Sequence, residues 1–188
     1  MESYVSSLRP FGLRGYFIKD VNYKKNNNKN CTLILCYGKG KIIGYVDKKY
    51  INDSNDCIDK YKVFIPRANN IATELNDDNL NAFVGKPKEI CTESYLVVGS
   101  SLNLNKNSAE NIVLYMKTKF MRYMHSLAKT SQDATSKTFR FVPMQDFTNK
   151  SDIDWKKSIK EIDKQLYKKY KLSKDEIAFI EKNIKPMK

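Results

Sequence analysis

The feature that most constrains the fold is a helical repeat of apolar residues between residues 108 and 127. Apolar side chains recur there at intervals of three and four positions, at Ile112, Met116, Phe120, Tyr123, Met124 and Leu127. An α-helix turns once every 3.6 residues, so this spacing places them on one face. Ser108 is a residue type that caps the first turn of a helix. We therefore expect one long helix with one buried face.

The chain before this helix consists of short runs rich in β-branched and aromatic residues. Residues 32–37 and 42–46 are two such runs, and residues 38–41 between them (Gly-Lys-Gly-Lys) are typical of a hairpin turn. Further strands are expected at residues 61–65 and 94–98, and one more after the helix, at residues 138–142. The runs are unevenly spaced, and residues 69–81 are polar enough for a loop with one short helix. This pattern predicts an irregular mixed β-sheet.

The end of the chain returns to a helical pattern. Apolar residues fall on one side of a helix at Trp155, Ile159, Ile162 and Leu166. Ser173 and Glu176 have the spacing of a capping box, which predicts a last short helix. The expected fold class is α+β. Residues 1–150 would form a domain with an irregular mixed sheet and one long helix, and residues 151–188 a C-terminal helical tail.

The chain carries a net charge of +13, from 34 lysine and arginine residues against 21 acidic residues. Such a charge attracts polyanions, and nucleic acid is the obvious candidate. Most of the basic residues are lysines, which also serve simply as solvated surface. The arginines are better candidates for specific contacts, because a guanidinium group fits phosphates and guanine edges. They are Arg9, Arg14, Arg67, Arg122 and Arg140.

Other residue types that often carry function have ordinary explanations in this sequence. The cysteines lack the close paired spacing of a zinc site, so free and partly buried thiols are expected at Cys31, Cys36, Cys57 and Cys91. His125, the single histidine, is interpreted as a surface or packing residue. The sequence has neither a run of 18 apolar residues nor a signal-peptide pattern after Met1. We therefore expect a cytoplasmic location without a membrane partner.

The motifs of a complete DNA-modifying enzyme are absent from the sequence. All five prolines are isolated, so the Asn-Pro-Pro-Tyr type tetrapeptide that grips a flipped adenine cannot occur. Residues 38–40 are too short and too basic for a dinucleotide-type glycine loop. Residues 47–49 (Asp-Lys-Lys) match the end of a nuclease pattern, which leaves a small metal-dependent nuclease relying on Asp47 or Asp59 as an alternative. A module whose lysine-rich helices dock an acidic protein is a second alternative.

Recognition of DNA needs no catalytic group, because amides and hydroxyls read base edges and basic groups hold phosphates. Loops rich in such residues occur at residues 6–14, 39–41, 67–70 and 129–137. The candidate DNA contacts are Arg9, Arg14, Lys39, Lys41, Arg67, Asn69, Arg122, Lys129, Gln132, Lys137 and Arg140. We assign no catalytic residue and no metal ligand.

Several strings resemble, in order, blocks that lie downstream of the catalytic domain in adenine-specific DNA methyltransferases of type II restriction-modification systems. They are residues 6–14, 61–63, 66–68, 91–99, 115–122, 141–147, 166–170 and 176–181. The resemblance runs in register over nearly the whole chain. In that family the corresponding region recognises the DNA target, and it is similar to the specificity subunits of type I systems.

The resemblance implies a double-stranded DNA recognition part that is not catalytic by itself. Residues 129–132 (Lys-Thr-Ser-Gln) match the polar turn that follows the long helix in the family, and a strand ending at Pro143 would come next. The implied partners are double-stranded DNA and a methyltransferase catalytic domain or subunit. Any S-adenosylmethionine or magnesium would belong to that catalytic part, which in the family precedes the block beginning near Tyr4.

Overall fold

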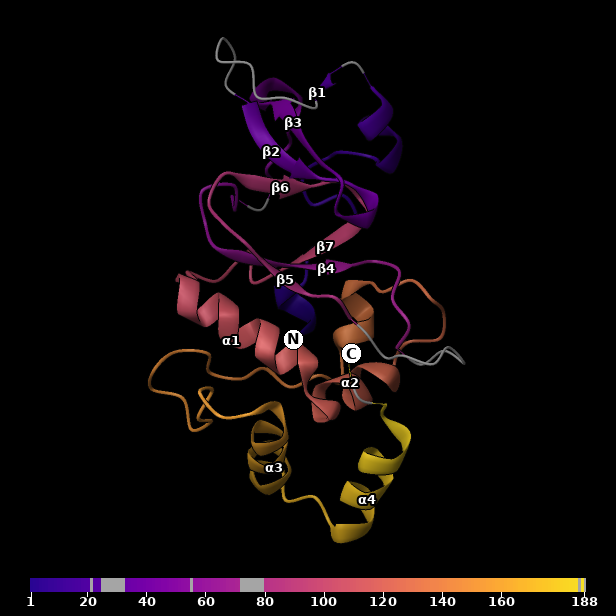
Figure 1. Cartoon of the computed structure of the whole chain (residues 1–188), viewed down its shortest axis with the longest axis vertical. Helices are drawn as coiled ribbons and strands as arrows, with labels where there is room; N and C mark the ends of the chain where they lie inside the picture. Colours follow the sequence, from indigo (N-terminus) through magenta and orange to yellow (C-terminus); the bar gives the residue numbers. More distant parts are fainter. Residues whose placement is uncertain (21, 25–32, 55, 72–79, 186, 188) are drawn as a thin grey trace.

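The computed structural model describes the chain except for residues 21, 25–32, 55, 72–79, 186 and 188. Figure 1 shows a first β-sheet, a second β-sheet and a set of helices that follow one another along the long axis. Short 3₁₀ helices connect these elements, namely η1 (Glu2–Tyr4), η2 (Gly15–Lys19), η3 (Lys39–Lys41), η4 (Lys48–Tyr50) and η5 (Ser136–Phe139). The expected α+β fold class is confirmed.

The first sheet has the strand order β1-β3-β2-β6. Its strands are β1 (Tyr23–Lys24), β2 (Leu33–Tyr37), β3 (Ile43–Asp47) and β6 (Glu89–Cys91). Strands β2 and β3 form the predicted antiparallel hairpin, while β6 runs parallel to β2. The sequence did not predict β1 or β6, because two or three residues are too few to show an alternating pattern.

The second sheet has the order β5-β4-β7 and is antiparallel. Its strands are β4 (Lys62–Pro66), β5 (Phe83–Gly85) and β7 (Tyr95–Val98). On β4, Val63 and Ile65 pack into the helical layer, whereas Phe64 packs toward the first sheet. Successive residues of a strand point to opposite faces, so this one strand contributes to two hydrophobic cores. Burial on both faces explains why residues 63–66 of the strand, which follow the buried Lys62, are an unbroken apolar run.

The long helix expected over residues 108–127 is two helices, α1 (Lys106–Lys117) and α2 (Lys119–Ser126). Thr118 between them has an extended backbone (φ −66°, ψ 147°). Its hydroxyl accepts a hydrogen bond from the backbone N–H of Met121 at 3.2 Å, so Thr118 caps the second helix. Asn105, rather than Ser108, caps the first helix.

The buried face of these helices is otherwise as expected. Ile112, Met116 and Phe120 are fully buried, and Tyr123 and Met124 pack partly buried against the same cluster. Leu127 is the exception, since half of its side chain is exposed. The reason is that α2 ends at Ser126, one residue before it.

The prediction of a strand at residues 138–142 is wrong. Residues 136–139 form η5, and a turn follows. The hydroxyl of Thr138 donates to the carbonyl of Thr135 at 2.7 Å and accepts from the backbone N–H of the same residue at 3.3 Å. This local bonding prevails over the β preference of the Thr, Phe and Val residues in the segment.

The C-terminal tail contains α3 (Ile159–Lys169) and α4 (Lys174–Asn183). The capping box predicted from Ser173 and Glu176 is confirmed at the start of α4. Trp155 lies before α3 rather than on it, and its indole N–H donates to the carbonyl of Asp146 at 3.0 Å. Both helices contribute to the hydrophobic core that also contains Val63 of the second sheet. The domain boundary at residue 150 stays a prediction.

Two further expectations can be compared with the structure. Cys36, Cys57 and Cys91 are free and buried, as interpreted, while Cys31 lies outside the described residues. Among the helices that the structure describes, none has both the length and the apolar character needed to cross a membrane.

Candidate nucleic-acid interface

A cavity of about 500 Å³ lies between the hairpin tip of the first sheet and the ends of two strands of the second. Its lining comes from four separate segments of the chain and combines Lys39, Gly40, Lys41, Pro66, Arg67, Ala68, Asn81, Ser94 and Tyr95. Three residues that the sequence predicted as DNA contacts are therefore brought together here.

The hairpin tip is held in place by its backbone. Gly40 and Lys41 both have left-handed backbone angles, with φ of 69° and 61°, and together they turn the chain tightly. The backbone N–H of Lys41 donates to the hydroxyl of Tyr95 at 2.9 Å, which fastens the tip to the second sheet. The ammonium of Lys41 lies 4.8 Å from the centre of the Phe83 ring. The exposed Lys39 is left to face solvent at the mouth of the cavity.

Arg67 follows β4 directly and lies beside the turn at residues 132–134. Its Nε is 3.4 Å from a carboxylate oxygen of Asp133, and its carbonyl accepts from the backbone N–H of Ala134 at 2.7 Å. Two residues further along, the backbone N–H of Asn69 donates to the carbonyl of Gln132 at 3.2 Å. These contacts hold the turn that carries the exposed Gln132 against the segment that follows β4. The guanidinium of Arg67 is one third exposed and therefore reachable from solvent.

The loop at residues 9–15 reaches the same region through Glu93. The carboxylate of Glu93 lies 3.2 Å from Nε of Arg9 and accepts from the backbone N–H of Gly15 at 2.9 Å. The Gly15 hydrogen bond, followed by the charges of Arg9 and Arg67, lowers the pKa of Glu93. Arg14 next to Gly15 is exposed. We call Arg9, Arg14, Lys39, Lys41, Arg67 and Gln132 the basic surface.

Three predicted contacts lie inside the fold instead. Arg122 is buried, and it donates from Nε to the carbonyl of Thr118 at 3.2 Å and from Nη1 to that of Lys185 at 2.7 Å. Lys129 is also buried, and its ammonium donates to the carbonyl oxygens of Asn69 (3.0 Å) and Ile71 (2.7 Å).

Asn69, the third of these residues, is buried too, and its side chain accepts from the backbone N–H of Ile71 at 3.3 Å. All three side chains serve internal hydrogen bonds. They are therefore not part of the basic surface.

Lys137 and Arg140 are exposed but lie elsewhere. Lys137 is on η5 and Arg140 directly follows it, and this segment packs against η1 and α2 in the helical layer. The guanidinium of Arg140 lies 4.6 Å from the centre of the Phe141 ring. These two residues stay candidate contacts of a separate patch.

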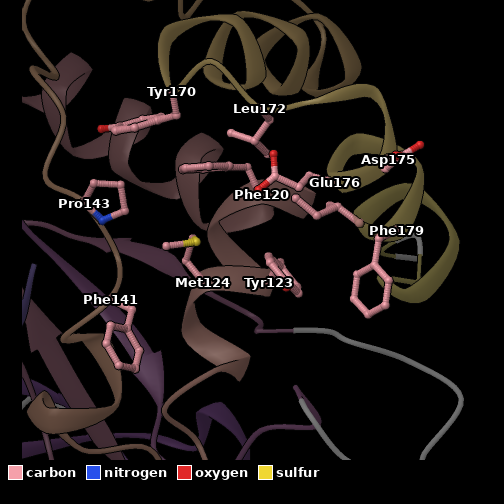
Figure 2. Close-up of a pocket in the computed structure, with 11 residues that line it drawn as sticks. Phe120, Tyr123, Met124, Phe141, Pro143, Tyr170, Leu172, Asp175, Glu176 and Phe179 are labelled. Carbon is pink, nitrogen blue, oxygen red and sulfur yellow. The ribbon is translucent and has the colours of Figure 1, made fainter.

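A second pocket, which the sequence did not suggest, lies between α2, the α3–α4 turn and α4 (Figure 2). It has a volume of about 510 Å³ and is lined mainly by aromatic and aliphatic side chains. The rings of Phe120 and Tyr170 stack with centres 5.0 Å apart, and 53% of Phe179 at the edge is exposed. Two acidic residues, Asp175 and Glu176, lie in the first turn of α4 at its edge, and Glu176 is engaged in the cap of that helix. Such a lining suits apolar contacts rather than acid–base chemistry.

No family model, curated protein or solved structure matches this chain. Functional assignment accordingly rests on the residues themselves and on the resemblance of the sequence blocks.

Two of the residues considered for catalysis, Asp47 and His125, have structural roles, while Asp59 is an exposed turn residue. Asp47 caps η4 by accepting from the backbone N–H of Lys49 at 3.1 Å, and its other oxygen lies 3.7 Å from the ammonium of the same lysine. His125 is buried with its ring centre 4.2 Å from that of Phe139, and burial lowers its pKa to about 3. It is a packing histidine. Within the described residues, no group of three His, Cys, Asp or Glu side chains is placed to hold a metal ion.

Proposed function

We propose that this chain is the sequence-specific, double-stranded DNA recognition module of a restriction-modification adenine methyltransferase and is not catalytic by itself. The observation that carries the proposal is the cavity in which Lys39, Lys41 and Arg67 meet, although they come from different sheets. The ordered resemblance of the sequence blocks supports the same assignment. The proposal includes a cytoplasmic location, where such enzymes meet DNA.

The residues of the basic surface divide into two roles. Lys39 and Lys41 sit at a protruding hairpin tip, where ammonium groups neutralise backbone phosphates regardless of sequence. Arg67 pairs with Asp133, the residue that follows Gln132, and a guanidinium and an amide are the side chains that read guanine and adenine edges in the major groove. Phosphate contacts would set the register, and Arg67 and Gln132 would read the bases.

Methyl transfer would come from a catalytic domain or subunit that acts with this module. That partner would hold S-adenosylmethionine, and magnesium where a nuclease is also present. The chain would supply the target choice.

Binding of a fluorescent duplex of about three helical turns, followed by anisotropy over a series of salt concentrations, tests the proposal. We expect log affinity to fall with log salt by about 0.9 for each phosphate contacted. The double charge reversal K39E/K41E should reduce that slope and weaken binding of every duplex. A matched double reversal of exposed lysines elsewhere, K150E/K156E, changes net charge equally and should have a much smaller effect.

Two results would overturn the proposal. One is affinity that does not depend on salt. The other is equal weakening by both double variants, since this would mean that net charge alone attracts the DNA. A plasmid incubated with the protein and Mg²⁺ should also stay intact. Cleavage that disappears in Asp47→Ala would instead support the nuclease alternative.

A further inference from the structure

Helix α3 lies at the end of the molecule opposite the first sheet (Figure 1), and a row of lysines follows one side of it. Lys160, Lys164, Lys168 and Lys171 all line a groove of about 710 Å³ between α3 and α4. The first three are spaced four residues apart, which is about 6 Å along a helix. All four are exposed, and none forms an ion pair with a described residue. The row therefore presents several cations that are not ion-paired within the described residues, although Glu161 and Glu181 lie close enough to interact with Lys164 and Lys160.

The floor of this groove is apolar rather than charged. It is formed by Tyr167, Leu172 and Ile177, of which the last two are half-buried. One acidic residue, Glu181, also lines the groove. Its carboxylate already accepts from the hydroxyl of Tyr167 at 3.0 Å and from the ammonium of Lys119 at 2.8 Å. It is therefore largely neutralised and leaves the lysine row unbalanced.

We propose that the α3–α4 groove docks an acidic amphipathic helix of a protein partner. An apolar stripe on that helix would cover Leu172 and Ile177, and carboxylates spaced four residues apart would meet the lysines one by one. A nucleic acid backbone would satisfy the ammonium groups but would gain nothing from the apolar floor. Charge complementarity along the edge and an apolar centre together favour a protein helix.

The backbone at Lys171 provides a test of the assignment. Lys171 lies just past α3 with a left-handed φ of 54°, a position that glycine or asparagine occupies more readily in helix ends. Replacement of this lysine by glycine should therefore remove a cation from the row without straining the backbone.

The groove lies apart from the basic surface, so the inference stands whether or not the chain binds DNA. A fluorescein-labelled helical peptide of about 18 residues, with a leucine stripe flanked by glutamates at four-residue spacing, serves as the probe. A matched peptide carries glutamine in place of each glutamate. Fluorescence anisotropy near physiological ionic strength measures binding of both peptides to the full chain.

We expect the acidic peptide to bind and the glutamine peptide to bind at least about tenfold more weakly. The double reversal K164E/K168E should weaken binding of the acidic peptide by a similar factor, whereas K150E/K156E, with the same net charge, should leave it nearly unchanged. Ile177→Gln should also weaken binding of the acidic peptide, because it removes an apolar contact from the floor of the groove. Lys171→Gly should lower affinity while the thermal midpoint stays equal or rises, a combination that a purely structural role would not give.

The inference is overturned if the acidic peptide does not bind, or if K150E/K156E weakens it as much as K164E/K168E. It is also overturned if K164E/K168E abolishes binding of a duplex DNA and spares the peptide, because the groove would then be a phosphate site. Loss of DNA binding in K39E/K41E with peptide binding intact would show that the two surfaces act separately. Failure of DNA binding altogether would contradict only the proposed function.

Discussion

Asp163 accepts a hydrogen bond from the backbone N–H of Phe120 at 2.9 Å, although 43 residues separate the two. Its other oxygen accepts from the backbone N–H of Lys119 at 3.0 Å. Both donors belong to the first turn of α2, where backbone N–H groups have no partner within the helix. Thr118 caps only the N–H of Met121, so a carboxylate on α3 supplies the acceptor for the first two N–H groups of α2 and joins the two helices.

Removing this carboxylate should destabilise the protein more than an exposed cap would. We expect Asp163→Ala to lower the free energy of unfolding by about 2–3 kcal/mol, because two buried donors lose their acceptor. Urea denaturation measures the change. The control is Ser158→Ala, which removes the exposed cap of α3 and should cost only about 1 kcal/mol. Equal midpoints for Asp163→Ala and the wild type would contradict this role.

Acid should destabilise the fold through His125. Burial lowers its pKa to about 3, compared with 6.5 in the unfolded chain. As the pH falls below 6.5, the unfolded chain therefore binds a proton that the folded chain does not. Stability is fully present above pH 6.5 and decreases as the pH falls toward 3, by roughly 3–5 kcal/mol over the whole window. Urea denaturation at a series of pH values should show this decrease, and His125→Phe should reduce it.

Asp163 acts in the opposite direction, so the comparison is best made in its absence. Burial raises the pKa of Asp163 to about 6, above the unfolded value of 3.8. The stability that comes from this pKa shift, as distinct from the cap hydrogen bonds, is greatest below pH 3.8 and disappears as the pH rises through 6. The Asp163→Asn variant lacks that contribution. In this variant the free energy of unfolding should therefore decrease more steeply with falling pH, as the protonation of His125 requires. Identical slopes with and without His125 would rule out the assignment.

Lys62 should be essential for folding despite being a charged residue in a core. It is completely buried, and its ammonium donates to the carbonyl oxygens of Ile58 (3.0 Å), Lys60 (2.8 Å) and Lys86 (3.1 Å). Lys62→Met would leave three carbonyl groups without this donor and should cost about 3–5 kcal/mol. The neighbouring Lys60→Met, on a partly exposed side chain, should cost less than about 1 kcal/mol. Thermal denaturation of both variants decides between these expectations.

DNA binding should separate Arg67 from Lys129. If Arg67 reads a base, Arg67→Ala should relax sequence discrimination by roughly 1–3 kcal/mol. Duplexes selected from a random pool by the wild type provide the preferred sequence for this measurement. Lys129→Met should lower the thermal midpoint but leave the salt dependence of binding as it is, because its ammonium serves two internal carbonyl groups. Uniform weakening on all sequences would make Arg67 a phosphate anchor.

The parts of the fold that could be predicted from the sequence are those that local chemistry determines. The β2–β3 hairpin follows from the glycines of its turn, and the start of α4 follows from the Ser173–Glu176 box. The break at Thr118 could not be predicted in the same way, because the acceptor for the first two N–H groups of α2 is Asp163 on another helix. The strand expected at residues 138–142 failed because a threonine hydroxyl bonded locally.

The candidate site shows the same limit. Lys39, Lys41 and Arg67 were predicted one by one, but their meeting depends on how the sheets stack. Arg122 and Lys129 were predicted as contacts on charge, and their use inside the fold depends on carbonyl groups far along the chain, such as that of Lys185. The sequence offered the lysine-rich helices as a docking surface for an acidic protein, but the groove between α3 and α4 depends on how the two helices pack.

The alternation of Val63, Phe64 and Ile65 between two cores has a consequence for engineering. Neither half of the molecule can be cut out and keep its interior, because each half uses the second sheet as a shared wall. Transplantation of a whole half would therefore expose one side of that wall. Exchange of the hairpin tip and the residues around Arg67 alone would leave both interiors closed, so under the proposed function it is the smaller graft that should change the DNA target.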